Sequence, residues 1–428
     1  MHKSFVIKLI HVSVFLLFVL LYIGFEEQEM VGTMMYHVDL TTNFAPYRNF
    51  LLLAVSLFML SFCLLGRWPR IFFSRFLLLM YLYVVADSLV WGPAESSGAL
   101  AYVVLLFSTM LPLLVYNFSY NAAIKLPQKA IEISMGIGLV VLAAFYAKTF
   151  QMVMLSYVLD SSFRDGTVYV FMMFLPFVMT LSNKKWRNLG ILLIFLALTS
   201  SLKRGGLVTS VIALVAYYIV SQRVNEKHTA GLVKILAFVA VLIFIVIVLI
   251  YINYTSDGMI LDRFSSMDSD GGSGRDVVYA RTWELITDSN GIELLLGHGW
   301  NFVRIDSPLE VSAHNDYLEA MYDLGIIGFL FLFILLLQLF WISHRLVRSR
   351  SEYAAAYTAS VVIFFITTMI SHLFLYPLNM TAMTLFWGYV AGKEQMKRDI
   401  ISSGLSNASK VDESLQPEAE KAVFLPET

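Results

Sequence analysis

One hydrophilic stretch, roughly residues 254–322, holds the side chains best suited to chemistry. An arginine presents a planar fork that grips phosphate through two hydrogen bonds, and it keeps its charge at any working pH. His314 lies in the same stretch, and a histidine can move a proton near neutral pH. Acidic residues outnumber the arginines and lysine is absent, which excludes a general basic surface. Arginines that can bind phosphate, together with one histidine that can transfer a proton, predict chemistry on a phosphate-bearing substrate. The arginines are Arg263, Arg275, Arg281 and Arg304.

The residues after His314 predict a helix. Leu318, Met321 and Leu324 recur at helical spacing, so a helix should begin near Asn315. His314 and Asn315 would then lie at its start, where backbone N–H groups and the helix dipole attract anions. In the alternative interpretation, Asn315 or Asp316 is only the N-cap of that helix and His314 is an incidental loop residue.

Arg275 follows a glycine-rich turn, residues 271–274, and precedes an amphipathic stretch, residues 277–286. Glycines let a backbone come close to a bulky polar ligand, so this arginine is a candidate phosphate ligand. Its alternative is a solvated loop arginine paired with Asp276. For Arg281, on the amphipathic stretch, the solvated alternative is the stronger of the two.

Other polar residues favour structural roles. Trp300, in the turn around Gly297–Gly299, is typical of an aromatic residue at a membrane surface. A metal site would need ligands at tight spacing, whereas His298 and His314 are far apart, so we expect none there. Asp87, Lys148 and His372 are more typical of satisfied or snorkelled side chains than of site residues. The stretch considered for metal contains His298, Asp306, Glu310, His314 and Asp316.

The elements that position these residues must be membrane helices. The chain has 428 residues, of which 58% are hydrophobic and 14% charged, whereas a soluble domain carries about a quarter charged residues. Apolar runs of about 18 residues or more recur along it, which predicts an all-α integral membrane protein. The first run should be a retained helix, and the single Cys63 excludes an intrachain disulfide. We expect about twelve spans, at residues 4–25, 48–66, 71–90, 98–118, 130–147, 167–182, 187–202, 205–221, 232–253, 323–342, 354–374 and 376–392.

Loop charges predict the sidedness. Basic loops alternate along the chain with acidic or neutral ones, and short loops rich in Lys and Arg stay cytoplasmic. Both termini should therefore be cytoplasmic, and the insert, with its own short helices, should lie outside the membrane. The expected organisation is spans one to nine in residues 1–253, the periplasmic insert in 254–322, the last three spans in 323–400, and a disordered cytoplasmic tail in 401–428.

One loop breaks the charge pattern. Lys203 and Arg204 lie between two spans on the outer side. Snorkelling of long cationic side chains to the headgroups is one explanation. In the other, Arg204 faces a cleft on the same side as the insert, where its small neighbours let a bulky group approach the backbone.

Three motifs together resemble the bacterial O-antigen ligase and O-antigen polymerase superfamily, over roughly residues 186–341. Each motif is short, but all three follow the order of the family and lie on one predicted side of the membrane. The first is Ser201-Leu202-Lys203-Arg204-Gly205, the second is Ser273-Gly274-Arg275 with Tyr279 and the later Gly297 and Gly299, and the third is His314, Asn315, Leu318, Gly325 and Gly328.

The resemblance implies an inner-membrane glycosyltransferase of the lipid-phosphosugar type. Such enzymes move a glycan from undecaprenyl diphosphate to a hydroxyl on the periplasmic face, without cofactor or metal. By resemblance, Arg204 and Arg275 would bind the diphosphate and His314 would be the catalytic histidine. Attack opposite the leaving group would invert the anomeric carbon. Secondary candidates are Arg281, Asn315, Tyr317 and Lys203.

Several functions share these features. A ligase transfers the glycan to lipid A–core, and a polymerase of O-antigen, capsule or exopolysaccharide transfers it to a second lipid-linked glycan. Both need the same donor chemistry, so the motifs do not separate them, and we lean slightly to the ligase. A polysaccharide lipid transporter is the alternative class, but the charged residues cluster outside the spans and no paired halves are evident. A structural membrane subunit is a third class. No nucleic acid is expected as a partner.

Overall fold

The computed structural model describes most of the chain as helix. Among the described residues there is no β-strand, which confirms the all-α class for this part of the protein. The expected span at 232–253 falls almost entirely outside the described residues. These are residues 3–30, 45–65, 68–69, 72–91, 99–158, 168–200, 204–224, 250, 254, 271–309 and 311–419.

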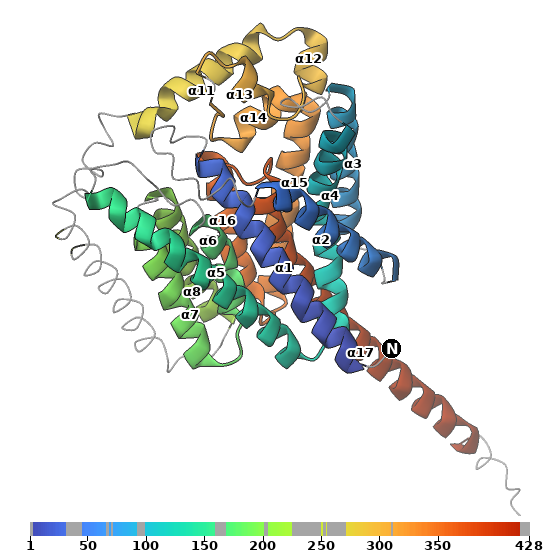
Figure 1. Cartoon of the computed structure of the whole chain (residues 1–428). Coiled ribbons are helices and arrows are strands. Elements are labelled where there is room, and N and C mark those ends of the chain that lie inside the picture. The colour runs from blue at the N-terminus through green and yellow to red at the C-terminus, as the bar shows by residue number, and fades with distance from the viewer. Residues whose placement is uncertain are drawn as a thin grey trace, which may run out of the picture.

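A bundle of long apolar helices forms the body of the molecule (Figure 1). Apart from residues 232–253, every expected span coincides with one of these helices. Four described segments are long and apolar enough to cross a membrane: Phe72–Trp91, Gln128–Ala147, Gly205–Val224 and Gly325–Arg348. The full count of spans and their sidedness stay predictions. The helices are α1 (Lys3–Met30), α2 (Ala45–Leu65), α3 (Phe72–Trp91), α4 (Ala99–Lys125), α5 (Gln128–Val158), α6 (Val168–Met179), α7 (Lys184–Ser200), α8 (Arg204–Val224), α15 (Gly325–Arg348), α16 (Ala354–Ile370) and α17 (Pro377–Ala419).

The centre of the bundle is packed around α17. A Cβ added at Gly388 or Gly392 would overlap backbone of α4, at Tyr116 and Tyr120 respectively, so these two small residues let the helices touch closely. On another face of α17, the buried Trp387 donates a hydrogen bond to Ser360 of α16 at 3.1 Å. The position of α16 in this core is therefore fixed, which matters because its C-terminal end borders the site described below.

The described part of the insert contains four helices, which gather at one end of the bundle (Figure 1). They enclose a small apolar core that contains Ile286, Val303, Ala313 and Tyr322. Tyr83 of α3 anchors this unit, since its hydroxyl lies 3.1 Å from the carbonyl oxygen of Leu296 and 2.7 Å from that of Leu324. The insert is thus attached to the bundle. Its helices are α11 (Gly271–Asp288), α12 (Gly291–Leu296), α13 (Phe302–Asp306) and α14 (Asp316–Asp323).

The polar composition after residue 401 predicts a disordered tail, which stays a prediction. α17 is described as a helix to Ala419, and residues 420–428 lie outside the described residues. The helix projects from the end of the bundle opposite to the insert (Figure 1).

Candidate functional site

His314 lies on the connection that leads into α14, and its side chain is exposed. Its backbone is left-handed, with φ 52°. Asn315 follows as the N-cap: its side-chain oxygen accepts hydrogen bonds from the backbone N–H groups of Tyr317 at 3.0 Å and Leu318 at 3.3 Å. The predicted helix start near Asn315 is therefore confirmed. Asn315 itself acts as the cap, as in the alternative interpretation.

Tyr279 of α11 holds the backbone around His314. Its hydroxyl lies 3.4 Å from the carbonyl oxygen of His314 and 3.2 Å from that of Met369, near the end of α16. A phenol has one proton, so it donates to one of these oxygens at a time. Arg275 lies one helical turn before Tyr279 and therefore on the same face of α11. The second and third motifs meet in this way at the end of α16.

The first motif reaches the same place. A Cβ added at Gly205 would lie 2.9 Å from Cδ1 of Ile370, the last residue of α16. Gly205 therefore lies directly against the last residue of α16. Arg204 is the first residue of α8, so its backbone starts beside the end of α16. The side chain of Arg204 and the whole of Lys203 lie outside the described residues.

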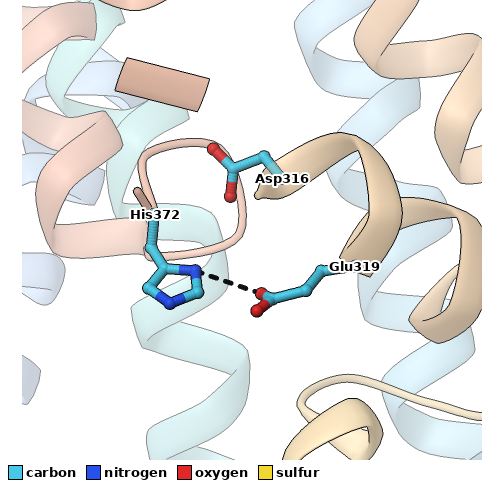
Figure 2. Close-up of side chains that lie close together, drawn as sticks. All are labelled: Asp316, Glu319 and His372. Carbon is cyan, nitrogen blue, oxygen red and sulfur yellow. Dashed lines mark ion pairs between the residues drawn. The ribbon is translucent and has the colours of Figure 1, made fainter. Parts of the chain in front are cut away.

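Asp316, Glu319 and His372 form a buried polar cluster (Figure 2). It lies next to His314, whose ring contacts that of His372. Nδ1 of His372 is 3.2 Å from Oε2 of Glu319, and both side chains are buried. Asp316 is fully buried, and its Oδ2 accepts hydrogen bonds from the backbone N–H groups of Leu373 and Phe374, each at 2.8 Å. Asp316 and Glu319 come from the first turn of α14, whereas His372 comes from the connection between α16 and α17. The cluster therefore joins the insert to the bundle.

Aromatic contacts extend this cluster to His314. The ring of His372 lies between two others: its centroid is 4.6 Å from that of His314 and 4.7 Å from that of Tyr376. His314 is thus exposed on one side and backed by a buried histidine on the other.

Burial and mutual charge shift the pKa values of the cluster. Burial raises the pKa of Asp316 to about 7, and Glu319 adds to this, while His372 and the two N–H donors oppose it. For His372 burial disfavours the charged form, but Glu319 and Asp316 outweigh it, and the net pKa is raised above 6.5. Arg275 lowers the pKa of His372, so its guanidinium lies within electrostatic range of the buried ring.

Asp316, Glu319 and His372 are also the one group of described residues with donor atoms close enough together to hold a metal ion. Carboxylate and imidazole are donors that divalent cations accept. This is not the set considered from the sequence, of which only Asp316 belongs to it. Of that set, His298 is stacked on Tyr322, with ring centroids 4.0 Å apart, and lies 3.5 Å from Glu293. Glu310 lies outside the described residues.

The glycine turn of the second motif docks against the junction of α14 and α15. The backbone N–H of Gly299 donates to the carbonyl oxygen of Asp323 at 2.9 Å. The Asp323 carboxylate accepts from the backbone N–H groups of Asn301 and Val303, each at 2.9 Å. Burial, reinforced by Glu319, raises the pKa of Asp323 well above its usual range. This turn therefore holds the junction of α14 and α15 in place and contributes no exposed side chain to the site.

The secondary candidates separate by their contacts. Arg281 forms an exposed ion pair with Glu284 at 2.6 Å, one turn along α11, which fits its solvated alternative. The hydroxyl of Tyr317 accepts a hydrogen bond from Thr368 of α16 at 3.3 Å. Sequence reasoning gave no role to Glu319 and set His372 aside. The signal for Glu319 was its place one turn after Asp316 on a helix that starts at the site; His372, far along the chain, gave none.

Residues 189–333 match the family model described as O-antigen ligase. The match contains all three motifs, including Arg204, Arg275 and His314. It ends before the segment from Met369 to Tyr376 that these motifs contact. No curated protein matches the sequence significantly.

Proposed function

We propose that the protein is a glycosyltransferase of the inner membrane that uses undecaprenyl-diphosphate-linked glycan. The match of residues 189–333 to the O-antigen ligase family model supports this proposal. The acceptor is a sugar hydroxyl on the periplasmic face. In a ligase, this hydroxyl belongs to the lipid A–core. The observation that carries the proposal is the meeting of the three motifs, through Gly205, Tyr279 and His314, around the end of α16.

Arg204 and Arg275 bind the diphosphate in this proposal. Arg204 opens α8, a helix of 21 residues, and the free N–H groups at such a start favour an anion. Arg275 is half-buried and forms no ion pair with any described residue, whereas Arg281 is already paired with Glu284. An arginine without a carboxylate partner keeps its full fork for phosphate. These contrasts support Arg275 over Arg281 as the ligand.

His314 is the base in the transfer step. The acceptor oxygen attacks the anomeric carbon, the bond from that carbon to the diphosphate oxygen breaks, and the acceptor proton moves to His314. The electron pair leaves with the diphosphate, whose growing charge the two arginines stabilise. Attack opposite the leaving group inverts the anomeric centre. No step requires a metal ion. The exposed ring of His314 and its fixed backbone support this assignment.

A polymerase would use the same donor chemistry and differ only in the acceptor. It therefore stays the alternative within the same reaction class. A transporter would carry its polar site near the middle of the bundle, whereas the cluster around His314 lies at the end that bears the insert.

A reconstituted transfer assay tests the proposal. Purified protein in vesicles is given lipid-linked oligosaccharide and lipid A–core, and the product is separated on a gel. We expect transfer by the wild type and a loss of at least about 100-fold in His314→Ala, because a positioned base contributes about 10²–10⁴-fold. The control is His298→Ala, which removes a histidine of the same insert that faces Tyr322 instead.

Two outcomes would count against the proposal. Transfer of lipid across the vesicle membrane without glycan transfer would favour the transporter. Wild-type rates in His314→Ala at equal protein amounts would remove the base assignment. In cells, loss of all O-chain on deletion indicates a ligase, and a single capping repeat indicates a polymerase.

A further inference from the structure

We propose that His372, held by Glu319, is a positioning residue that fixes the ring of His314 for proton transfer; this inference rests on the proposed function. Neither His372 nor Glu319 is one of the residues that define the three motifs. His372 also lies beyond the part of the chain that matches the family model.

The contact between the two histidine rings is the first step. Their centroids are 4.6 Å apart and the planes are inclined by 40°, so the rings pack against each other and are not joined by a linear hydrogen bond. The backbone of His314 is already fixed by its left-handed conformation and by Tyr279. The packed face of His372 restricts the remaining freedom, which is the orientation of the exposed imidazole.

The second step is that contacts on several sides restrain His372. Glu319 lies 3.2 Å from its Nδ1, Tyr376 covers another part of the ring, and the side-chain amide of Asn379 donates to its carbonyl oxygen at 2.7 Å. Asp316 secures the next two residues through their backbone N–H groups. A ring fixed on this many sides is a rigid support for the base beside it.

The charges around His372 explain why the support uses a histidine. Glu319 and Asp316 of α14 favour its charged form, and Arg275 of α11 opposes it. Because the Glu319 carboxylate is buried, it needs a positive or hydrogen-bonding partner. A protonated His372 provides that positive partner at 3.2 Å and packs against His314 at the same time. A base oriented by a neighbour that is itself held by a carboxylate follows the general logic of activated catalytic groups.

The insert contains a second histidine–glutamate pair that serves as a matched control. His298 lies 3.5 Å from Glu293, and its ring is stacked on Tyr322. No described contact links this pair to His314. Equivalent substitutions in the two pairs therefore remove the same chemical groups at different distances from the proposed base.

The experiment compares Glu319→Gln and His372→Ala with Glu293→Gln and His298→Ala in the vesicle assay. We expect kcat to fall about 10–100-fold in the first two, the size of loss that a misplaced reacting group causes. The KM for the lipid-linked donor should stay within about threefold, since positioning residues do not bind it. Both control variants should keep kcat. Glu319→Gln keeps the size of the side chain, so it stays informative if His372→Ala fails to fold.

A double-mutant cycle tests whether the two residues act as one unit. The combined Glu319→Gln and His372→Ala protein should lose no more activity than the stronger single variant. His372→Ala combined with Glu293→Gln should show only the loss of His372→Ala. Multiplied losses in the first combination would overturn the proposal.

Other results would also overturn it. They are wild-type kcat in both Glu319→Gln and His372→Ala, a raised KM with unchanged kcat, or one equivalent of bound metal that Glu319→Gln removes. The failure of the proposed function is distinct, because the wild type would then transfer no glycan. If His314→Ala is inactive while both His372→Ala and Glu319→Gln are normal, only the positioning role fails.

Discussion

Gly297 and Gly325 face each other so closely that neither position has room for a side chain. A Cβ at Gly297 would lie 2.7 Å from the backbone nitrogen of Gly325, and one at Gly325 would lie 2.6 Å from that of Gly297. Both residues have positive φ, 93° and 65°. The glycines of the second and third motifs thus form one backbone contact, which sets α12 against the start of α15.

Gly297→Ala should destabilise the protein by about 3 kcal/mol or more, because the new methyl overlaps Asp323 and the backbone is left-handed. Thermal unfolding in detergent measures the effect. Gly291→Ala is the control: nothing lies within 4 Å of its added Cβ, so stability should be unchanged or slightly higher. Equal melting temperatures in the two variants would contradict this account of the contact.

Arg275→Lys should reduce transfer about 10-fold or more, because lysine cannot grip the diphosphate with two parallel hydrogen bonds. The matched variant is Arg281→Lys, on the same helix, which should leave the rate unchanged since Arg281 pairs with Glu284. Initial rates at saturating and limiting donor measure both. If Arg275→Lys retains full activity, only the charge matters at this position.

Tyr279→Phe should lower kcat about five- to tenfold, because the variant keeps the ring but loses a hydrogen bond of about 1 kcal/mol to the backbone at His314 or Met369. Tyr322→Phe provides the comparison. It removes a hydroxyl that donates to Asp306 at 2.8 Å, away from the base. A normal rate in Tyr279→Phe would mean that the hydroxyl does not hold His314.

The stability that Asp316 contributes should fall as pH rises from about 4 to about 7, and that of His372 as pH rises above about 6.5. The pKa of Asp316 is raised to about 7 and that of His372 is raised above 6.5, so both bind protons more tightly in the folded state. Such groups stabilise the fold at low pH, and the contribution is lost as pH rises through the folded-state pKa. Melting temperatures across this range measure the effect.

Asp316→Asn separates the charge from the hydrogen bonds. The amide oxygen still accepts from Leu373 and Phe374, but the titrating carboxyl is gone. We expect a smaller loss of stability between about pH 4 and 7 than in the wild type. Asp316→Ala should be less stable at all pH values, because two buried N–H groups lose their partner at about 1–3 kcal/mol each. An unchanged pH slope in Asp316→Asn would contradict the assigned cause.

Local patterns in the sequence were enough to predict the helices and the part of the site that the insert contributes. Apolar runs gave the bundle, and the spacing of Leu318 and Met321 gave the start of α14. These features depend on neighbours in the chain. His372 was set aside because its partners, Glu319 and His314, are more than fifty residues away, and no periodicity reports a contact of that range. The grouping of Asp316 and Glu319 with His372 could not be predicted for the same reason, because the fold brings together residues that are far apart in the chain.

The insert is not a self-contained unit, because Tyr279, Asp316 and Glu319 all have their partners between Met369 and Phe374. Moving residues 189–333 alone into a relative would separate these side chains from the segment on which they close. An exchange of acceptor specificity between such proteins would therefore have to include the connection between α16 and α17 together with the insert.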